Sequence, residues 1–133
     1  MSAIFEPIRV INLVTEKTEQ SPTAFGLRLM YFQLSALPTQ EWIQLFDNQR
    51  HIPKHRNMVG GREATIGGRF AVVDCAPDEL EKQHELLKHD VSVTNNDYQE
   101  YLNKIEARAL QDAQVRKAEL EKIEGIKSRL KFD

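Results

Sequence analysis

Alternation of hydrophobic and polar positions predicts strands in the first third of the chain. In residues 24–34 one face would carry Phe25, Leu27, Leu29 and Tyr31, and the other Met30, Phe32 and Leu34. Apolar residues on both faces predict a central strand that is covered on both sides for part of its length. Residues 7–14, rich in Val, Ile and Leu, predict another strand, and the polar stretch 15–23 predicts the loop between them.

A helical spacing follows, and it predicts a turn and then a helix within residues 35–50. Three apolar residues at i, i+3 and i+4 would share one helix face: Trp42, Leu45 and Phe46. Pro38 suits the first helical position, where its missing N–H costs no hydrogen bond. The helix must end before Pro53, because proline removes a helical hydrogen bond.

A repeated Gly-Gly-Arg triplet, at residues 60–62 and 67–69, predicts tight turns. A Gly-Gly pair can supply the positive φ angles that a two-residue hairpin turn requires. We therefore expect residues 62–66 and 69–75 to form a pair of antiparallel strands. Residues 57–59 are a candidate strand on the other side of this hairpin.

The last third of the chain predicts two helices. The first would cover residues 76–89, with Pro77 in its first turn, followed by a short strand or extended connector at 91–93. Polar residues at 94–97 are N-cap candidates for a second helix, which would reach about Leu130. A helix of that length exceeds what the rest of the chain can cover, so part of it should project or bend back near Gly125.

These elements predict an α+β fold. We expect an antiparallel sheet of about four strands, in the order strand, strand, helix, hairpin, helix, with helices on one face and a long C-terminal helix. Residues 1–94 would form the sheet domain. Residues 95–133 would form the long helix, packed on the domain at its start and projecting or self-associating towards its end.

Composition limits the classes of function. The chain has 133 residues, 41% of them hydrophobic, and a formal net charge of −2, so no whole-chain field would attract nucleic acid or an anionic membrane. Its one cysteine cannot form an internal disulfide or a cysteine-based zinc site, and a lone thiol suits a reducing compartment. The start of the chain lacks a signal-peptide pattern and no apolar run could span a membrane, which favours a cytoplasmic protein.

A local basic segment at residues 50–69 is the first candidate site. It combines glycines with five cations: Arg50, Lys54, Arg56, Arg62 and Arg69. Guanidinium groups together with exposed backbone amides favour a phosphate or nucleic-acid contact. The alternative is an exposed loop whose charge serves solubility and whose glycines serve the turns, since the segment has no interleaved aromatic residues for base stacking.

Signals for catalysis and for metal binding are weak. His51 and His55 have a ligand spacing, but Pro53 lies between them and Lys54 beside them would repel a cation. Cys75 is flanked by acids, which work against a reactive thiolate, so we expect a core residue. We predict no catalytic residues, no metal site and no cofactor; the alternative is an enzyme whose site is formed only in three dimensions.

The end of the long helix is the second candidate site. Tyr98, Leu102, Ile105 and Ala109 keep a coiled-coil repeat, Asp112 and Arg116 break it, and apolar residues then resume in a shifted register. Four of these apolar residues form the candidate partner or oligomer interface: Leu120, Ile123, Ile126 and Leu130. The sequence thus predicts a non-enzymatic interaction or adaptor protein that forms a homo-oligomer or docks a protein partner, with a nucleic-acid-binding accessory protein as the alternative.

Overall fold

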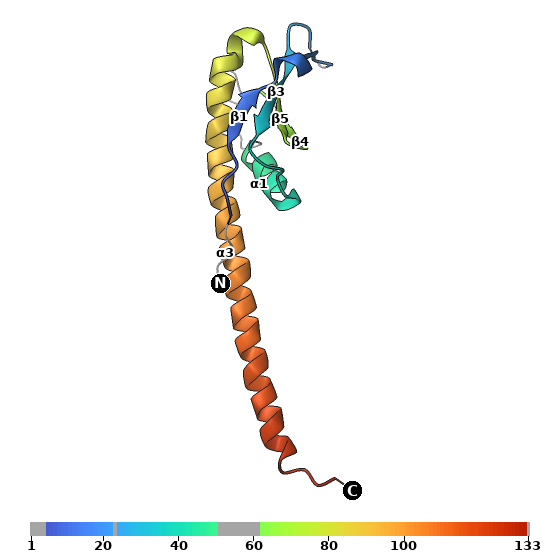
Figure 1. The fold of residues 1–133 in the computed structure, drawn as a ribbon, viewed down its shortest axis with the longest axis vertical. Helices are drawn as coiled ribbons and strands as arrows, with labels where there is room; N and C mark the ends of the chain where they lie inside the picture. The colour runs from blue at the N-terminus through green and yellow to red at the C-terminus, as the bar shows by residue number, and fades with distance from the viewer. Residues whose placement is uncertain (1–4, 23, 51–61, 133) are drawn as a thin grey trace. The chain divides into compact units, whose positions relative to one another are not determined.

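The computed structural model of the chain describes residues 5–22, 24–50 and 62–132. By internal contacts the chain divides into two units, one running from Phe5 to Tyr98 and one that contains the residues from Gln99 onward. Helix α3 (Leu80–Lys127) begins in the first unit and continues into the second (Figure 1). The predicted boundary after residue 94 therefore falls inside a helix.

The first unit contains a five-stranded antiparallel sheet, which confirms the predicted α+β class. Its strands are β1 (Val10–Leu13), β2 (Glu19–Gln20), β3 (Arg28–Leu34), β4 (Ala64–Gly67) and β5 (Phe70–Cys75). The spatial order is β1-β3-β5-β4, and the two-residue strand β2 also pairs with β3 (Figure 1). Strand β3 is central, as its pattern predicted. The predicted loop 15–23 holds β2 and a short 3-10 helix, η1 (Thr15–Lys17).

The predicted hairpin is present as β4 and β5. Gly67 pairs with Phe70, which leaves a two-residue loop of Gly68 and Arg69. Gly68 has a φ of 56°, and no non-glycine residue among those described has a positive φ. A positive φ at the first loop position alone is typical of a type II′ turn, so the turn needs one glycine of the pair rather than both. The other Gly-Gly pair and the candidate strand 57–59 lie outside the described residues.

Burial alternates strictly along the two central strands. The buried side chains are Met30, Phe32 and Leu34 of β3 and Ala71, Val73 and Cys75 of β5. The residues between them are only partly buried, because they point to the opposite face of the sheet. His84 of α3 stacks on Phe32 with ring centroids 5.6 Å apart, so α3 covers the buried face. Helices on one face of an antiparallel sheet are what the sequence predicted.

Helix α1 (Gln40–Arg50) contributes the bulkiest part of the core. Trp42 and Phe46 are both fully buried, and their rings stack with centroids 5.6 Å apart. The hydroxyl Oγ1 of Thr39 accepts a hydrogen bond from the backbone N–H of Trp42 at 3.2 Å. Thr39 is therefore the N-cap, and the prediction that Pro38 occupies the first helical position is wrong by two residues.

The two helices predicted in the last third are one helix. After a short 3-10 turn, η2 (Pro77–Glu79), helix α3 runs without interruption from Leu80 to Lys127. The predicted strand or connector at 91–93 is wrong, because Val91 is buried on the sheet side of the helix and Thr94 bonds within it through Asp90 O at 2.7 Å. Gly125 also lies within the helix, so the alternative of a bend at that point is wrong.

Candidate interaction surfaces

The part of α3 that lies in the second unit carries large apolar side chains exposed to solvent. Among them, Ile105 is 48% exposed, Leu120 51%, Ile123 51% and Ile126 40%, and Leu130 just beyond the helix is 54% exposed. By contrast, Leu87 and Val91 in the first unit are 0% and 3% exposed. The four predicted interface residues, Leu120, Ile123, Ile126 and Leu130, are therefore accessible in the structure.

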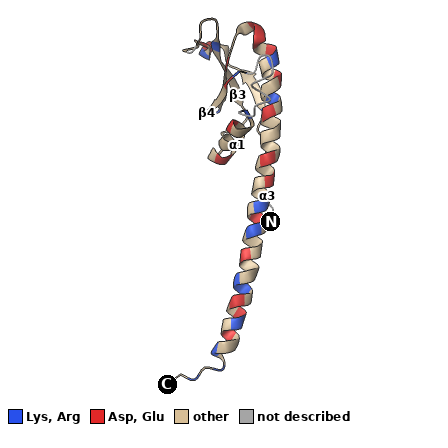
Figure 2. Cartoon of the chain, turned by 180° about the vertical axis from the view of Figure 1, so that it is seen from behind, with Lys and Arg blue, Asp and Glu red and all other residues tan. Residues whose placement is uncertain are grey.

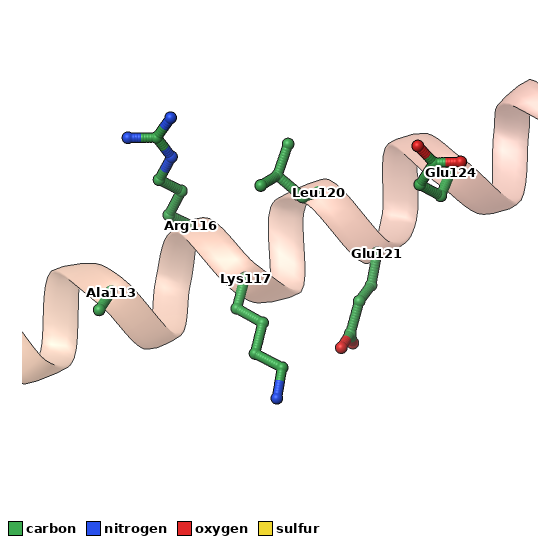
Figure 3. A pocket seen from close by; sticks show the side chains of 6 residues that line it. All are labelled: Ala113, Arg116, Lys117, Leu120, Glu121 and Glu124. Atoms are coloured by element: carbon green, nitrogen blue, oxygen red, sulfur yellow. The ribbon is translucent and has the colours of Figure 1, made fainter.

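Charged residues of both signs are mixed with these apolar positions along α3 (Figure 2). A shallow depression between Ala113 and Glu124 illustrates the surface, because Arg116 and Glu124 lie on either side of Leu120 while Lys117 and Glu121 point the other way (Figure 3). All six residues that line this depression come from one helix, so it has no opposing wall. Such a surface suits an extended partner lying along the helix better than an enclosed small molecule.

Arg50, a predicted phosphate contact, is held inside the first unit. Its Nη1 lies 2.8 Å from Oδ2 of Asp90, and the two side chains are 6% and 0% exposed. Its Nη2 also donates to the backbone carbonyl of Arg62. The guanidinium group thereby joins the end of α1, the chain before β4 and the first quarter of α3. A buried charge with these partners has a structural role, and it does not face a ligand from solution.

Arg62, a second predicted phosphate contact, forms a bidentate pair with Glu79. Its Nε and Nη2 each lie 3.1 Å from a carboxylate oxygen of Glu79, whose Oε1 also accepts the backbone N–H of Ala76 at 2.9 Å. Those hydrogen bonds hold the pKa of the Glu79 carboxyl below its usual value. The pair fixes the entry of the chain into α3.

Of the other three predicted cations, the structure describes only Arg69. Arg69 is exposed in the β4–β5 turn, where its backbone carbonyl accepts the N–H of Leu34 at 2.7 Å. Lys54 and Arg56 lie outside the described residues, as do His51 and His55. Of the three arginines in this set that the structure describes, Arg50 and Arg62 each pair with an acid, whereas Arg69 is exposed to solvent.

Asn95, expected only as an N-cap candidate, holds three segments together. Its Oδ1 accepts the backbone N–H of Ile8 at 3.1 Å and the indole N–H of Trp42 at 3.0 Å, and its Nδ2 donates to the carbonyl of Ile8 at 2.8 Å. The side chain amide thus pairs with Ile8 as a neighbouring strand would. Nothing local in the sequence distinguishes Asn95 from Asn96, because the partners lie 53 and 87 residues away.

Cys75 and His84, which would be the nucleophile and base of a cysteine-based site, lie in different surroundings. Cys75 is fully buried, and burial, together with the nearby carboxylate of Glu79, raises the pKa of its thiol to about 11. His84 lies in a different environment, against Phe32 in a groove of about 390 Å³ beside β1 whose lining residues do not include Cys75. Within the described ranges, no group of three His, Cys, Asp or Glu residues could hold a metal ion.

The sheet face opposite the helices carries an aromatic pair that sequence analysis missed. Tyr31 on β3 and Phe70 on β5 are partly buried, and their rings meet edge to face with centroids 5.9 Å apart. The ammonium group of Lys17 lies 5.6 Å from the first ring and 5.1 Å from the second. Only strand pairing brings these residues together, since they are far apart along the chain.

Comparison with protein-family models, with curated proteins and with solved structures found no match to this chain. In the part of the chain that the structure describes, no helix is both long and apolar enough to cross a membrane.

Proposed function

We propose that this is a non-enzymatic interaction protein of the cytoplasm that self-associates or docks a protein partner through the second half of α3. One observation carries the proposal: from Gln99 onward the helix keeps its regular structure while large aliphatic side chains along it are 40–60% exposed. Isolated helices are marginal in water, and most helical stability in proteins comes from packing of an apolar face. A protein surface lying along this helix would supply that packing.

The physical basis is the area available for burial. Burial of a Leu or Ile side chain contributes about 1.5–3 kcal/mol relative to full exposure, so burying the exposed parts of four such residues on each chain would offset much of the entropy cost of association. The interspersed charges would keep the surface soluble before it binds and would set the choice of partner. The buried, protonated thiol of Cys75 is compatible with the reducing compartment that the proposal assumes.

The test is the solution mass of the full chain at about 1–100 µM by sedimentation equilibrium, with two matched single substitutions. Leu120, Ile123, Ile126 and Leu130 form the apolar stripe. Ile123→Glu places a charge on this stripe and should reduce association at least about tenfold. Leu110→Glu makes the same change at a residue that is 60% exposed and lies outside the stripe, so it should leave association unchanged. The proposal would be contradicted if the full chain were a monomer whose amide hydrogens beyond Leu110 exchange within seconds.

A second candidate function is binding of single-stranded nucleic acid, and the aromatic pair on the sheet face opposite the helices is the observation that favours it. Aromatic side chains on central strands can stack bases, and Lys17 and Arg69 would add contacts to phosphates. Fluorescence anisotropy of short labelled RNA and DNA at low salt would test it. Binding should weaken steeply with salt and in a Lys17→Ala/Arg69→Ala variant, but not in Lys82→Ala, an exposed control on α3. Equal binding by both variants would reject this sheet face as the site.

A further inference from the structure

A single heptad numbering places the isoleucines on both sides of the polar stretch of the exposed helix at a and d positions. The polar residues between them interrupt the apolar repeat but not this numbering. If Ile105 is assigned to position d, the following a and d positions are Ala109, Asp112, Arg116, Glu119, Ile123 and Ile126, with Leu102 at the preceding a. Ala109, Asp112, Arg116 and Glu119 are all exposed, as are Ile105, Ile123 and Ile126. The frame is therefore apolar at both ends and charged in the middle.

This arrangement is self-complementary when two copies run antiparallel. In an antiparallel pair each a position faces a d position of the second copy. With the twofold axis at the level of Gln114, Ile105 faces Ile123 of the second copy and Asp112 faces Arg116. The complete set of facing pairs, each of which occurs twice, is Leu102 with Ile126, Ile105 with Ile123, Ala109 with Glu119, and Asp112 with Arg116.

Other arrangements of two copies lose this match. In a parallel pair in register, Asp112, Arg116 and Glu119 would each face their own copy, giving three consecutive layers of like charge. In the antiparallel pair, a shift of one heptad places Arg116 against Ile105 in one direction and Asp112 against Ile123 in the other. An isolated charge against an aliphatic side chain is costly to desolvate, so the charged middle selects both orientation and register.

We infer that the occupant of this surface is a second copy of the same chain, paired antiparallel along residues 102–126 with reciprocal Asp112–Arg116 ion pairs at its centre. The inference rests on the proposed function and deepens it by naming the partner. The ion pairs lie in the seam between the helices, where they specify register, while the apolar layers at each end supply most of the binding free energy. Arg108, on the flank of the seam, lies near the level of Glu119 of the second copy and provides a cation for it.

Cysteine cross-linking tests the orientation. Ile105→Cys and Ile123→Cys are made singly in the otherwise natural chain, because Cys75 is buried and its thiol stays protonated, and the unmodified chain is the control. Under mild oxidation the mixture of the two variants should give a cross-linked heterodimer, while each variant alone should give little. Strong cross-linking of either variant alone, with no excess in the mixture, would show a parallel pair and overturn the inference while leaving the proposed function intact.

Charge reversal tests the central layers. Asp112→Arg and Arg116→Asp should each weaken dimerisation by about tenfold or more, because each places like charges opposite one another. The double variant Asp112→Arg/Arg116→Asp restores opposite charges in both layers, and its dissociation constant should return to within about threefold of the natural one. A natural chain that stays monomeric at about 100 µM, or a double variant no better than the single ones, would overturn the inference.

Discussion

Helix α3 passes through two regions in which the same kinds of side chain differ in burial. In the first unit Leu87 is fully buried and Asp90 is fully buried beside Arg50. In the second unit Ile123 is 51% exposed, and Asp112 and Arg116 are exposed. Both stretches combine aliphatic residues with acids and bases, so residue type does not decide burial. What decides it is whether another surface lies opposite, as the sheet does for the first region.

The comparison also shows how the two regions use charge. In the first unit the ion pairs Arg50–Asp90 and Arg62–Glu79 join elements of one chain, 40 and 17 residues apart in sequence. In the second unit the matching charges, Asp112 and Arg116, lie on a single helix, where their complement would be a second copy. Variants of the two sets of charges can distinguish ion pairs within one chain from ion pairs between two copies.

The largest effect is expected from breaking the buried ion pair. Asp90→Ala would leave the guanidinium of Arg50 buried without its carboxylate, and loss of one member of such a pair typically costs about 3–5 kcal/mol of unfolding free energy. Urea unfolding followed by the fluorescence of Trp42, the only tryptophan in the chain and fully buried, measures it. The double variant Arg50→Met/Asp90→Leu removes both charges and should recover at least half of the loss. Equal loss in both variants would mean that packing, not the unpaired charge, determines the effect.

An intermediate effect is expected at alkaline pH from Cys75. The thiol has a pKa of about 11 in the folded chain against an ordinary value of 9.0, so the unfolded state releases its proton first. The stabilisation is complete below about pH 9 and is lost as the pH rises towards 11, by up to about 3 kcal/mol for two pKa units. Cys75→Ala should lower stability at pH 7 but flatten this pH dependence between 9 and 11. An unchanged slope in that variant would assign the alkaline loss to other groups.

The smallest effect is expected from the exposed helix on the stability of the sheet unit. At a protein concentration well below the dissociation constant for self-association, Ile123→Glu should change the unfolding free energy reported by Trp42 by less than about 0.5 kcal/mol. The reason is that Ile123 is exposed and belongs to the second unit. A shift above about 1 kcal/mol, with Leu110→Glu unchanged, would contradict the division of the chain into a self-sufficient unit and a surface for a partner.

Local patterns were good guides where the signal is local. Alternation along residues 28–34 predicted the central strand, and the second Gly-Gly-Arg triplet predicted the β4–β5 hairpin. The same patterns failed at residues 91–93, where Val-Ser-Val suggested an extended connector. There the packing of Val91 on the sheet outweighs the modest β preference of valine, and no proline or glycine interrupts the helix.

The candidate sites also divide into those with a local sequence signal and those that depend on distant partners. The apolar positions at the end of α3 could be predicted from their spacing alone, because helical periodicity is a local signal. The roles of Arg50, Arg62 and Asn95 could not, because their partners lie 12 to 87 residues away in sequence. A cluster of basic residues looks the same whether each cation has a distant acid or not. Only the fold shows that two of the five predicted phosphate contacts already have one.

By itself, the sequence determined the fold class, the central strand, the hairpin and the presence of a long amphipathic helix, because periodicity and turn chemistry act over a few residues. It also determined the self-complementary order of apolar and charged positions between Leu102 and Ile126. Tertiary structure alone decided that two predicted helices are one, that Arg50 is buried against Asp90, and that Tyr31 meets Phe70. Each of these depends on residues brought together by sheet pairing and packing, and contacts over such separations leave no periodic trace in a single sequence.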